Sequence, residues 1–66
     1  MTVILNGEKY DMAENMSVLD LLNEKGVNPD RVVVEYNKNI VPKSDFANIK
    51  IAPNDTLEVL EFVGGG

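Results

Sequence analysis

The 66-residue sequence contains no cysteine and no histidine. Without cysteine the chain has no disulfide, no thiolate metal ligand and no thiol nucleophile. Without histidine it lacks the most common general base near neutral pH and the most common metal ligand. The acidic residues match no calcium-loop spacing. The sequence therefore predicts no metal site and little side-chain catalysis.

Basic residues are also scarce, since six Lys and Arg stand against eleven Asp and Glu, for a net charge of −5. The acids are spread along the chain without a basic stripe, which argues against nucleic acid as a partner. No apolar run reaches the length of a membrane span, and residues 1–5 are too short for the core of a signal peptide. We therefore expect a cytoplasmic protein that binds neither nucleic acid nor membrane.

A chain of this length forms one domain, which buries roughly 60% of the surface that the unfolded chain exposes. The composition is 44% hydrophobic and 26% charged. Periodic apolar runs with turn residues between them are typical of a globular and not of a disordered chain. We expect one folded domain over residues 1–63 and a flexible glycine tail over residues 64–66.

The first two expected strands form a hairpin. Residues 2–5 are rich in β-forming side chains, and Asn6-Gly7 favours the positive φ angles of a two-residue type I′ turn. Residues 8–12 can then return as the second strand. Because strand side chains alternate between faces, one face of the hairpin is apolar. Its members are Val3, Leu5, Tyr10 and Met12.

A helix is expected to begin after Ser17, which is a good N-cap residue. Asp20 occupies the third helical position, beside the positive end of the helix, and Met16 and Leu21 have the spacing of a hydrophobic staple. Gly26 can adopt the left-handed conformation that ends a helix. The expected length is about two and a half turns. The apolar stripe comprises Val18, Leu21, Leu22 and the stem of Lys25, with Leu19 beside it.

The remaining elements complete an α+β domain. A loop at residues 28–30 precedes a strand at 31–36 that is apolar on both faces. A short edge strand at 40–41 leads to a crossover that Phe46 is expected to anchor. The longest strand runs over 56–63, directly into the glycines. We therefore predict a mixed sheet packed on one amphipathic helix.

Several segments form a pattern that covers essentially the whole chain: Leu5-Asn6-Gly7, Val18 to Leu22, Val34 to Asn37, Ile40-Val41-Pro42, Asn54-Asp55 and Phe62 to Gly66. In these segments the chain resembles the ThiS family of sulfur carriers of thiamin thiazole synthesis, which have the ubiquitin-like β-grasp fold. The glycine tail is the most specific part. One departure is Asn54, at a turn position where family members often have glycine, although asparagine tolerates similar turn geometry.

The resemblance implies a role for the tail. A separate ATP-dependent activating enzyme, a ThiF-like adenylyltransferase, would adenylate the carboxylate of Gly66. A sulfur donor system would convert it to a thiocarboxylate, and a ThiG-like thiazole synthase would use that group as sulfur donor. Gly64 and Gly65 would thread the channel that leads to the partner's active site. The chain would thus be a protein co-substrate and not an enzyme.

The chemistry of glycine supports the same role independently of the family. Glycine has no Cβ, so a glycine tail can pass through a narrow channel. The chain has no G-x-x-x-x-G-K-[ST] phosphate loop and no glycine-rich turn that opens a helix. We therefore expect it to bind no cofactor, and ATP to be used by the partner.

A second candidate site is the outward face of the last strand. Leu57 and Val59 have one parity along the strand, and Leu60 and Phe62 have the other. If the first pair faces the helix, Leu60 and Phe62 form an exposed apolar patch suited to docking a partner. Burial under a loop or in a homodimer is the alternative. Glu58 and Glu61 are better explained as solvated carboxylates than as groups that steer the tail.

Other functions are compatible with these residues. The tail could carry sulfur for molybdopterin or for tRNA thiolation, and it could join a lysine amine, as in a ubiquitin-like protein modifier. A plain binding module without tail chemistry is the third alternative, because fold does not determine function.

Overall fold

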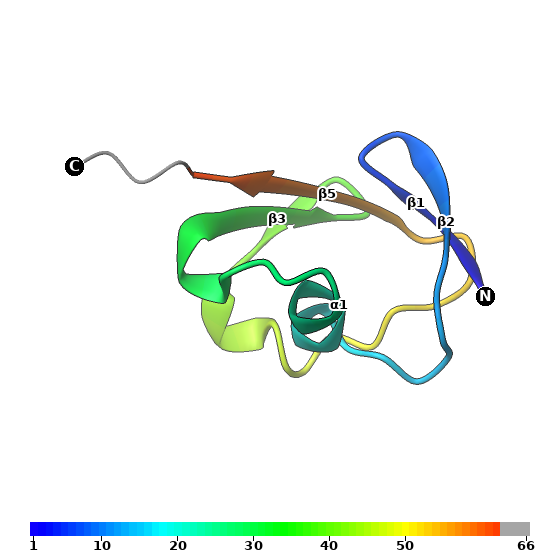
Figure 1. Ribbon diagram of the computed structural model, residues 1–66, viewed down its shortest axis with the longest axis horizontal. Helices are drawn as coiled ribbons and strands as arrows, with labels where there is room; N and C mark the ends of the chain where they lie inside the picture. The colour runs from blue at the N-terminus through cyan, green and yellow to red at the C-terminus, as the bar shows by residue number, and fades with distance from the viewer. Residues whose placement is uncertain (63–66) are drawn as a thin grey trace.

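A computed structural model describes residues 1–62 (Figure 1). The described part forms a sheet, one α-helix and two short 3-10 helices. The strands are β1 (Thr2–Leu5), β2 (Glu8–Asp11), β3 (Val32–Tyr36), β4 (Asn39–Val41) and β5 (Thr56–Glu61), and the helices are α1 (Val18–Glu24), η1 (Pro29–Arg31) and η2 (Lys43–Asp45).

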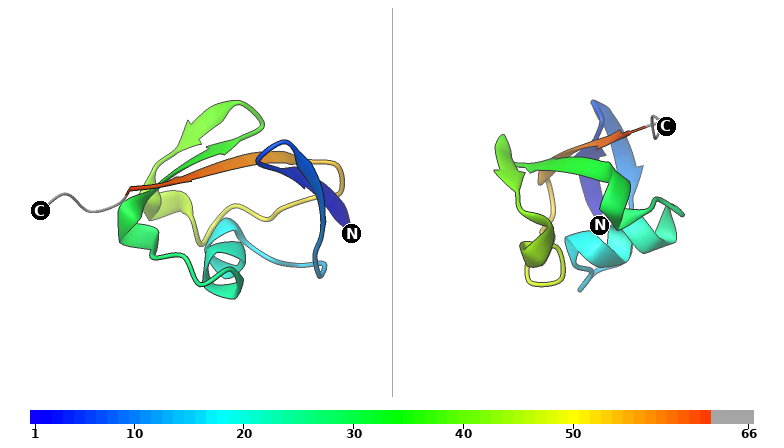
Figure 2. Two further views of the ribbon diagram at one scale, coloured as in Figure 1. Left: turned by 45° about the horizontal axis from the view of Figure 1, so that its top comes forward. Right: turned by 90° about the vertical axis from the view of Figure 1, so that its left-hand side faces the viewer.

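The sheet is mixed, with strand order β2-β1-β5-β3-β4. β5 lies at the centre, parallel to β1 and antiparallel to β3, and the two hairpins β1–β2 and β3–β4 flank it. Helix α1 lies against one face of the sheet, as both views in Figure 2 show. The predicted α+β domain, with a mixed sheet on one helix, is confirmed.

The first hairpin has the predicted turn. Asn6 and Gly7 have φ angles of 51° and 83°, as a type I′ turn requires at both central residues. Val3 is buried on β1, and Met12, one residue beyond β2, is also buried and donates its N–H to Met1 O at 2.8 Å. Leu5 and Tyr10 are partly buried against the same core. The predicted apolar face of the hairpin is therefore correct.

The predicted capping box opens α1. The Ser17 hydroxyl accepts a hydrogen bond from the Asp20 N–H at 3.1 Å, and the Asp20 carboxylate accepts one from the Ser17 N–H at 2.9 Å. That bond from the Ser17 N–H is the main cause that lowers the pKa of Asp20. The crossover supplies acceptors for the first two N–H groups of the helix. Ile49 O accepts from the Val18 N–H and Phe46 O from the Leu19 N–H. The start of the helix therefore leaves no backbone donor without a partner.

The helix ends as predicted at Gly26, whose φ is +72°. The Gly26 N–H donates to Asn23 O at 3.1 Å and the Val27 N–H to Leu22 O at 2.9 Å, which is the bonding of a Schellman motif. Because Lys25 is already the C-cap, the helix has seven residues, about half a turn fewer than expected.

The core lies between α1 and the inner face of the sheet. Val18, Leu21 and Leu22 on the helix are fully buried, as are Leu57 and Val34 on the central strands. Each such side chain stabilises the fold by roughly 1.5–3 kcal/mol through burial. Phe46 is buried too, so the prediction that it anchors the crossover is confirmed.

The strand boundaries differ from the predictions at four places. β2 ends at Asp11, one residue before its predicted end. Residues 28–30 were expected to form a loop before a strand at residue 31, but Pro29–Arg31 forms η1, and β3 begins one residue later. Asn28 causes this, because its side chain accepts the Asp30 N–H at 2.9 Å and caps the 3-10 turn. β4 gains Asn39, and β5 ends at Glu61, whereas Val63 lies outside the described residues.

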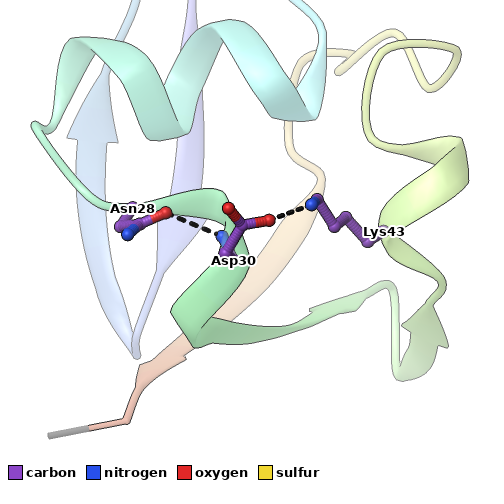
Figure 3. Close-up of polar contacts among 3 residues, drawn as sticks. All are labelled: Asn28, Asp30 and Lys43. Atoms are coloured by element: carbon purple, nitrogen blue, oxygen red, sulfur yellow. Dashed lines mark hydrogen bonds and ion pairs between the residues drawn. The ribbon is translucent and has the colours of Figure 1, made fainter. Parts of the chain in front are cut away.

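An ion pair joins the two 3-10 helices. The Asp30 carboxylate of η1 faces the Lys43 ammonium of η2 (Figure 3). Both side chains are exposed. Exposed pairs of this kind contribute little to stability, so this contact is not what positions β3.

A polar cluster holds the beginning of β5. The Asp55 carboxylate accepts hydrogen bonds from the Tyr36 hydroxyl, from the Ala52 N–H at 2.7 Å and from the Asn37 amide at 3.2 Å. Burial raises the pKa of Asp55, but these three hydrogen bonds together outweigh burial and lower it. Burial, followed by the bond to Asp55, raises the pKa of Tyr36 to about 12. Asn54, the departure noted in the sequence, has φ of 69° and so fits its turn.

We expect Asp55→Asn to lower the free energy of unfolding by about 1–2 kcal/mol near neutral pH, because bonds to a charged acceptor are worth more than bonds to a neutral one. A carboxyl whose folded pKa is lowered stabilises the fold above its unfolded pKa, and this contribution is lost as the pH falls through the folded pKa. Urea denaturation of the wild type should therefore show stability decreasing below about pH 4. The decrease should be smaller in Asp55→Asn.

Asp45→Asn, at an exposed aspartate of η2, is the control for this experiment and should follow the wild-type curve. An Asp55→Asn curve parallel to that of the wild type would show that the cluster does not couple stability to pH.

Candidate functional site

The candidate site is the C-terminal end of β5. Gly64, Gly65 and Gly66, the predicted reactive tail, lie outside the described residues, so their roles stay predictions. Phe62 is the last described residue, and its N–H donates to Arg31 O at 2.7 Å. The structure therefore describes β5 and Phe62, the part of the chain that leads into the tail.

The second half of β5 extends past β1. The parallel pairing with β1 has the register Ile4 to Thr56 and Leu5 to Leu57. The antiparallel pairing with β3 continues as far as Val32 opposite Glu61. Figure 1 shows the consequence, since β5 continues beyond the β1–β2 hairpin with β3 still beside it. The strand that carries the tail thus has backbone pairing on one side for its last residues.

The two faces of β5 differ as the sequence predicted. Leu57 is fully buried against the helix and Val59 is partly buried there. Leu60 and Phe62 point to the opposite face, where they are 63% and 56% exposed. Burial by a loop or by the described part of the fold is therefore excluded for both side chains. Their docking role stays a prediction.

Two more apolar residues lie on the same outer face. Val33 is directly opposite Leu60, and Ile40 of β4, 71% exposed, is opposite Glu35, which shares the parity of Val33. The sequence reasoning missed Ile40, although its parity relative to the buried Val41 was a usable signal. We call this set the outer patch: Val33, Ile40, Leu60 and Phe62.

Glu58 and Glu61 lie on different faces of β5. Glu58 is opposite Glu35 on the outer face, and like charges in this arrangement repel each other. Glu61 instead lines a pocket of about 160 Å³ whose apolar wall includes Leu22 and Val59. The two carboxylates therefore do not form one acidic site, which agrees with their interpretation as separate solvated groups.

Two further kinds of feature are absent from residues 1–62. The described residues bring together no group of three acidic side chains that could hold a metal ion. No helix in residues 1–62 has the length and hydrophobicity needed to cross a membrane. The outer patch and the tail that follows it are the features left to explain.

A model of the ThiS family matches residues 3–66, which include β5, Phe62 and the three glycines. The chain belongs to the ThiS family. The resemblance seen in the sequence and the β-grasp fold that it implied are confirmed.

Individual ThiS relatives agree with the family match. The sulfur carrier protein ThiS of Bacillus subtilis is 32% identical over 63 residues, which cover 94% of this chain and 96% of that protein. The crystal structure of a thiamine biosynthesis protein (ThiS) from Geobacter metallireducens is 30% identical and superposes with a TM-score of 0.86 over the whole of both chains.

A longer relative contains a ThiS-like segment. A thiazole synthase of Paramagnetospirillum magneticum is 42% identical over 66 residues. The match covers 100% of this chain and 20% of that protein. This chain therefore spans about a fifth of the length of the thiazole synthase.

We expect the double variant Leu60→Ala, Phe62→Ala to change the free energy of unfolding by less than about 1 kcal/mol, because exposed side chains lose little burial when they are shortened. Leu57→Ala, on the inner face of the same strand, should cost about 2–5 kcal/mol. Urea denaturation measures both values. A loss in the double variant as large as that in Leu57→Ala would show that the outer patch belongs to the core.

Proposed function

We propose that this ThiS-family protein carries sulfur as a thiocarboxylate on Gly66 and donates it for the synthesis of the thiamin thiazole. The observation that supports this most is the family match, which extends from residue 3 to the last residue of the glycine tail. The sequence supports it as well, because without cysteine or histidine the terminal carboxylate is the most suitable group for covalent chemistry.

The reaction divides into two substitutions. The Gly66 carboxylate first attacks the α-phosphorus of ATP, which forms an acyl-adenylate and releases pyrophosphate. A sulfur nucleophile then attacks the acyl carbon and displaces AMP, so that one carboxylate oxygen leaves with AMP and sulfur takes its place. ATP is proposed to bind to a separate ThiF-like adenylyltransferase, and the carrier itself would hold no cofactor. The carrier itself only presents the carboxylate.

A ThiG-like thiazole synthase is the proposed acceptor of the activated tail. The thiazole synthase of Paramagnetospirillum magneticum supports this, because it contains a segment similar to the whole of this chain. A carrier and a synthase on one polypeptide are kept at a high effective concentration. We propose that the synthase meets this chain through a surface near the tail.

The outer patch is the surface proposed for partner docking. It is apolar, three of its four side chains are exposed while Val33 is half-buried, and it includes the last described residue before the tail. Exposed apolar groups of this kind mark interaction surfaces. A partner that receives the tail would also cover Leu60 and Phe62, and it would thereby gain apolar burial next to the reacting carboxylate.

Incubation with an adenylyltransferase, ATP and a sulfur donor should increase the intact mass by the difference between sulfur and oxygen, localised to Gly66. Mass spectrometry of the whole chain and of its C-terminal peptide measures the change. A reaction without ATP, and a variant that lacks Gly65 and Gly66, are the controls and should show no increase. No change with an enzyme that activates the Bacillus subtilis carrier would refute the proposal, and adducts to lysine would favour a protein modifier.

We expect Leu60→Ala, Phe62→Ala to lower kcat/KM for this activation by about tenfold or more, because a few residues buried at the centre of an interface carry most of its binding energy. Initial rates at a series of carrier concentrations give the value. Thr56→Ala changes an exposed side chain on the same face of β5, at the end remote from the tail, and should react like the wild type. Equal rates for the double variant and the wild type would exclude the outer patch from docking.

A further inference from the structure

Asn6 lies at the point where β1 leaves the sheet. Its own N–H donates to Leu57 O at 2.9 Å, which is the last backbone bond from β1 to β5, and the chain then reverses at Gly7. The side chain of Asn6 bonds to β5 beyond the last backbone bond. Its Oδ1 accepts the Val59 N–H at 2.8 Å, and its Nδ2 lies 3.4 Å from Val59 O.

The carboxamide of Asn6 replaces a peptide group. It carries one carbonyl acceptor and N–H donors, as a backbone amide does. The odd-numbered residues of β5 direct their N–H and C=O toward the β1 edge, because the even-numbered residues are those bonded to β3, as the bonds at Thr56 and Phe62 show. By binding Val59, the side chain extends the hydrogen bonding along the β1 edge from Leu57 to the next odd-numbered residue of β5. Within residues 1–62, Asn6 is the last group on that edge that bonds to β5.

The turn alone does not require asparagine. Position 6 has φ of 51°, which glycine adopts at no steric cost and aspartate also tolerates. Glycine would therefore satisfy the turn as well as asparagine does. What asparagine adds is the carboxamide that reaches across 53 positions of sequence to Val59.

We infer that Asn6 is a positioning residue for the tail, an inference that rests on the proposed function. Its carboxamide holds β5 extended and in register at Val59, three residues before the end of the described chain. The strand that leads into the tail is thus ordered before a partner binds. Binding then costs less conformational entropy, because a preorganised segment has less freedom to lose.

Asn37 provides a matched control within the same fold. It also has a positive φ, 48°, at the turn of a hairpin, and its side chain also binds β5. Its Oδ1 accepts the Thr56 N–H at 2.9 Å and its Nδ2 donates to Asp55 at 3.2 Å. The two asparagines thus bind the first and the fourth residue of one strand. Only Asn6 acts at the end that leads to the tail.

The first test needs no partner. Amide hydrogen exchange is measured by NMR for the wild type, Asn6→Gly and Asn37→Gly. We expect the Val59 amide to exchange about tenfold faster in Asn6→Gly, because a protected donor becomes exposed to water. In Asn37→Gly the increase should instead fall on Thr56. Unchanged exchange at Val59 in Asn6→Gly would overturn the inference.

The second test measures activation by the adenylyltransferase with ATP, at a temperature at which urea curves show every variant folded. Asn6→Gly should lower kcat/KM by about fivefold, mostly through a higher KM for the carrier, since the lost hydrogen bond adds an ordering cost to binding. Asn6→Asp retains the acceptor for the Val59 N–H, and at an ionic strength that screens its added charge it should recover most of the loss. Asn37→Gly should react like the wild type.

The outcomes separate the two proposals. If the wild type gains no sulfur, the proposed function fails. If the wild type reacts and Asn6→Gly equals it, or if Asn37→Gly loses as much as Asn6→Gly, the positioning role of Asn6 is wrong and the carrier function stands. A loss confined to Asn6→Gly and recovered in Asn6→Asp supports the inference.

Discussion

Two sets of backbone hydrogen bonds meet on β5, the parallel pairing with β1 on one edge and the antiparallel pairing with β3 on the other. β5 lies between the two hairpins in the sheet, and among residues 1–62 no other strand joins them. Leu57 of this strand is also fully buried beneath α1. The sheet, the core and the direction in which the chain ends therefore depend on the same few residues.

Side chains accept hydrogen bonds from N–H groups of β5 that the neighbouring strands do not reach. Asn37 accepts the Thr56 N–H at the start of the strand, and Asn6 accepts the Val59 N–H beyond the last backbone bond to Asn6. Because these groups come from turns, they need no further element of secondary structure. In the described part of the chain the one α-helix lies on the inner face of the sheet, and no helix covers the outer face (Figure 2). The uncovered face is the one proposed to meet partners.

Local patterns predicted most of the fold. Ser17, Asp20 and Gly26 were enough to place both ends of α1, because capping depends on residues that are neighbours in sequence. The alternation of Leu57 and Val59 with Leu60 and Phe62 predicted that the two pairs lie on opposite faces of β5, and the structure shows that the first pair faces the core. η1 was missed because Asn28 and Asp30 form a side-chain turn that resembles a loop in sequence. Ile40 and the contact of Asn6 with Val59 depend on strand pairing between distant segments, which a single sequence does not encode locally.

The position of β5 in the chain has a consequence for synthesis. Of the strands in residues 1–62, β5 comes last in sequence and lies at the centre of the sheet, and the β1–β2 and β3–β4 hairpins have no backbone pairing with each other in this part of the chain. An isolated hairpin is at best marginally stable in water. A nascent chain that has not reached residue 56 is therefore left with two unjoined hairpins and is open to proteolysis. Closure of the sheet thus waits for the synthesis of β5.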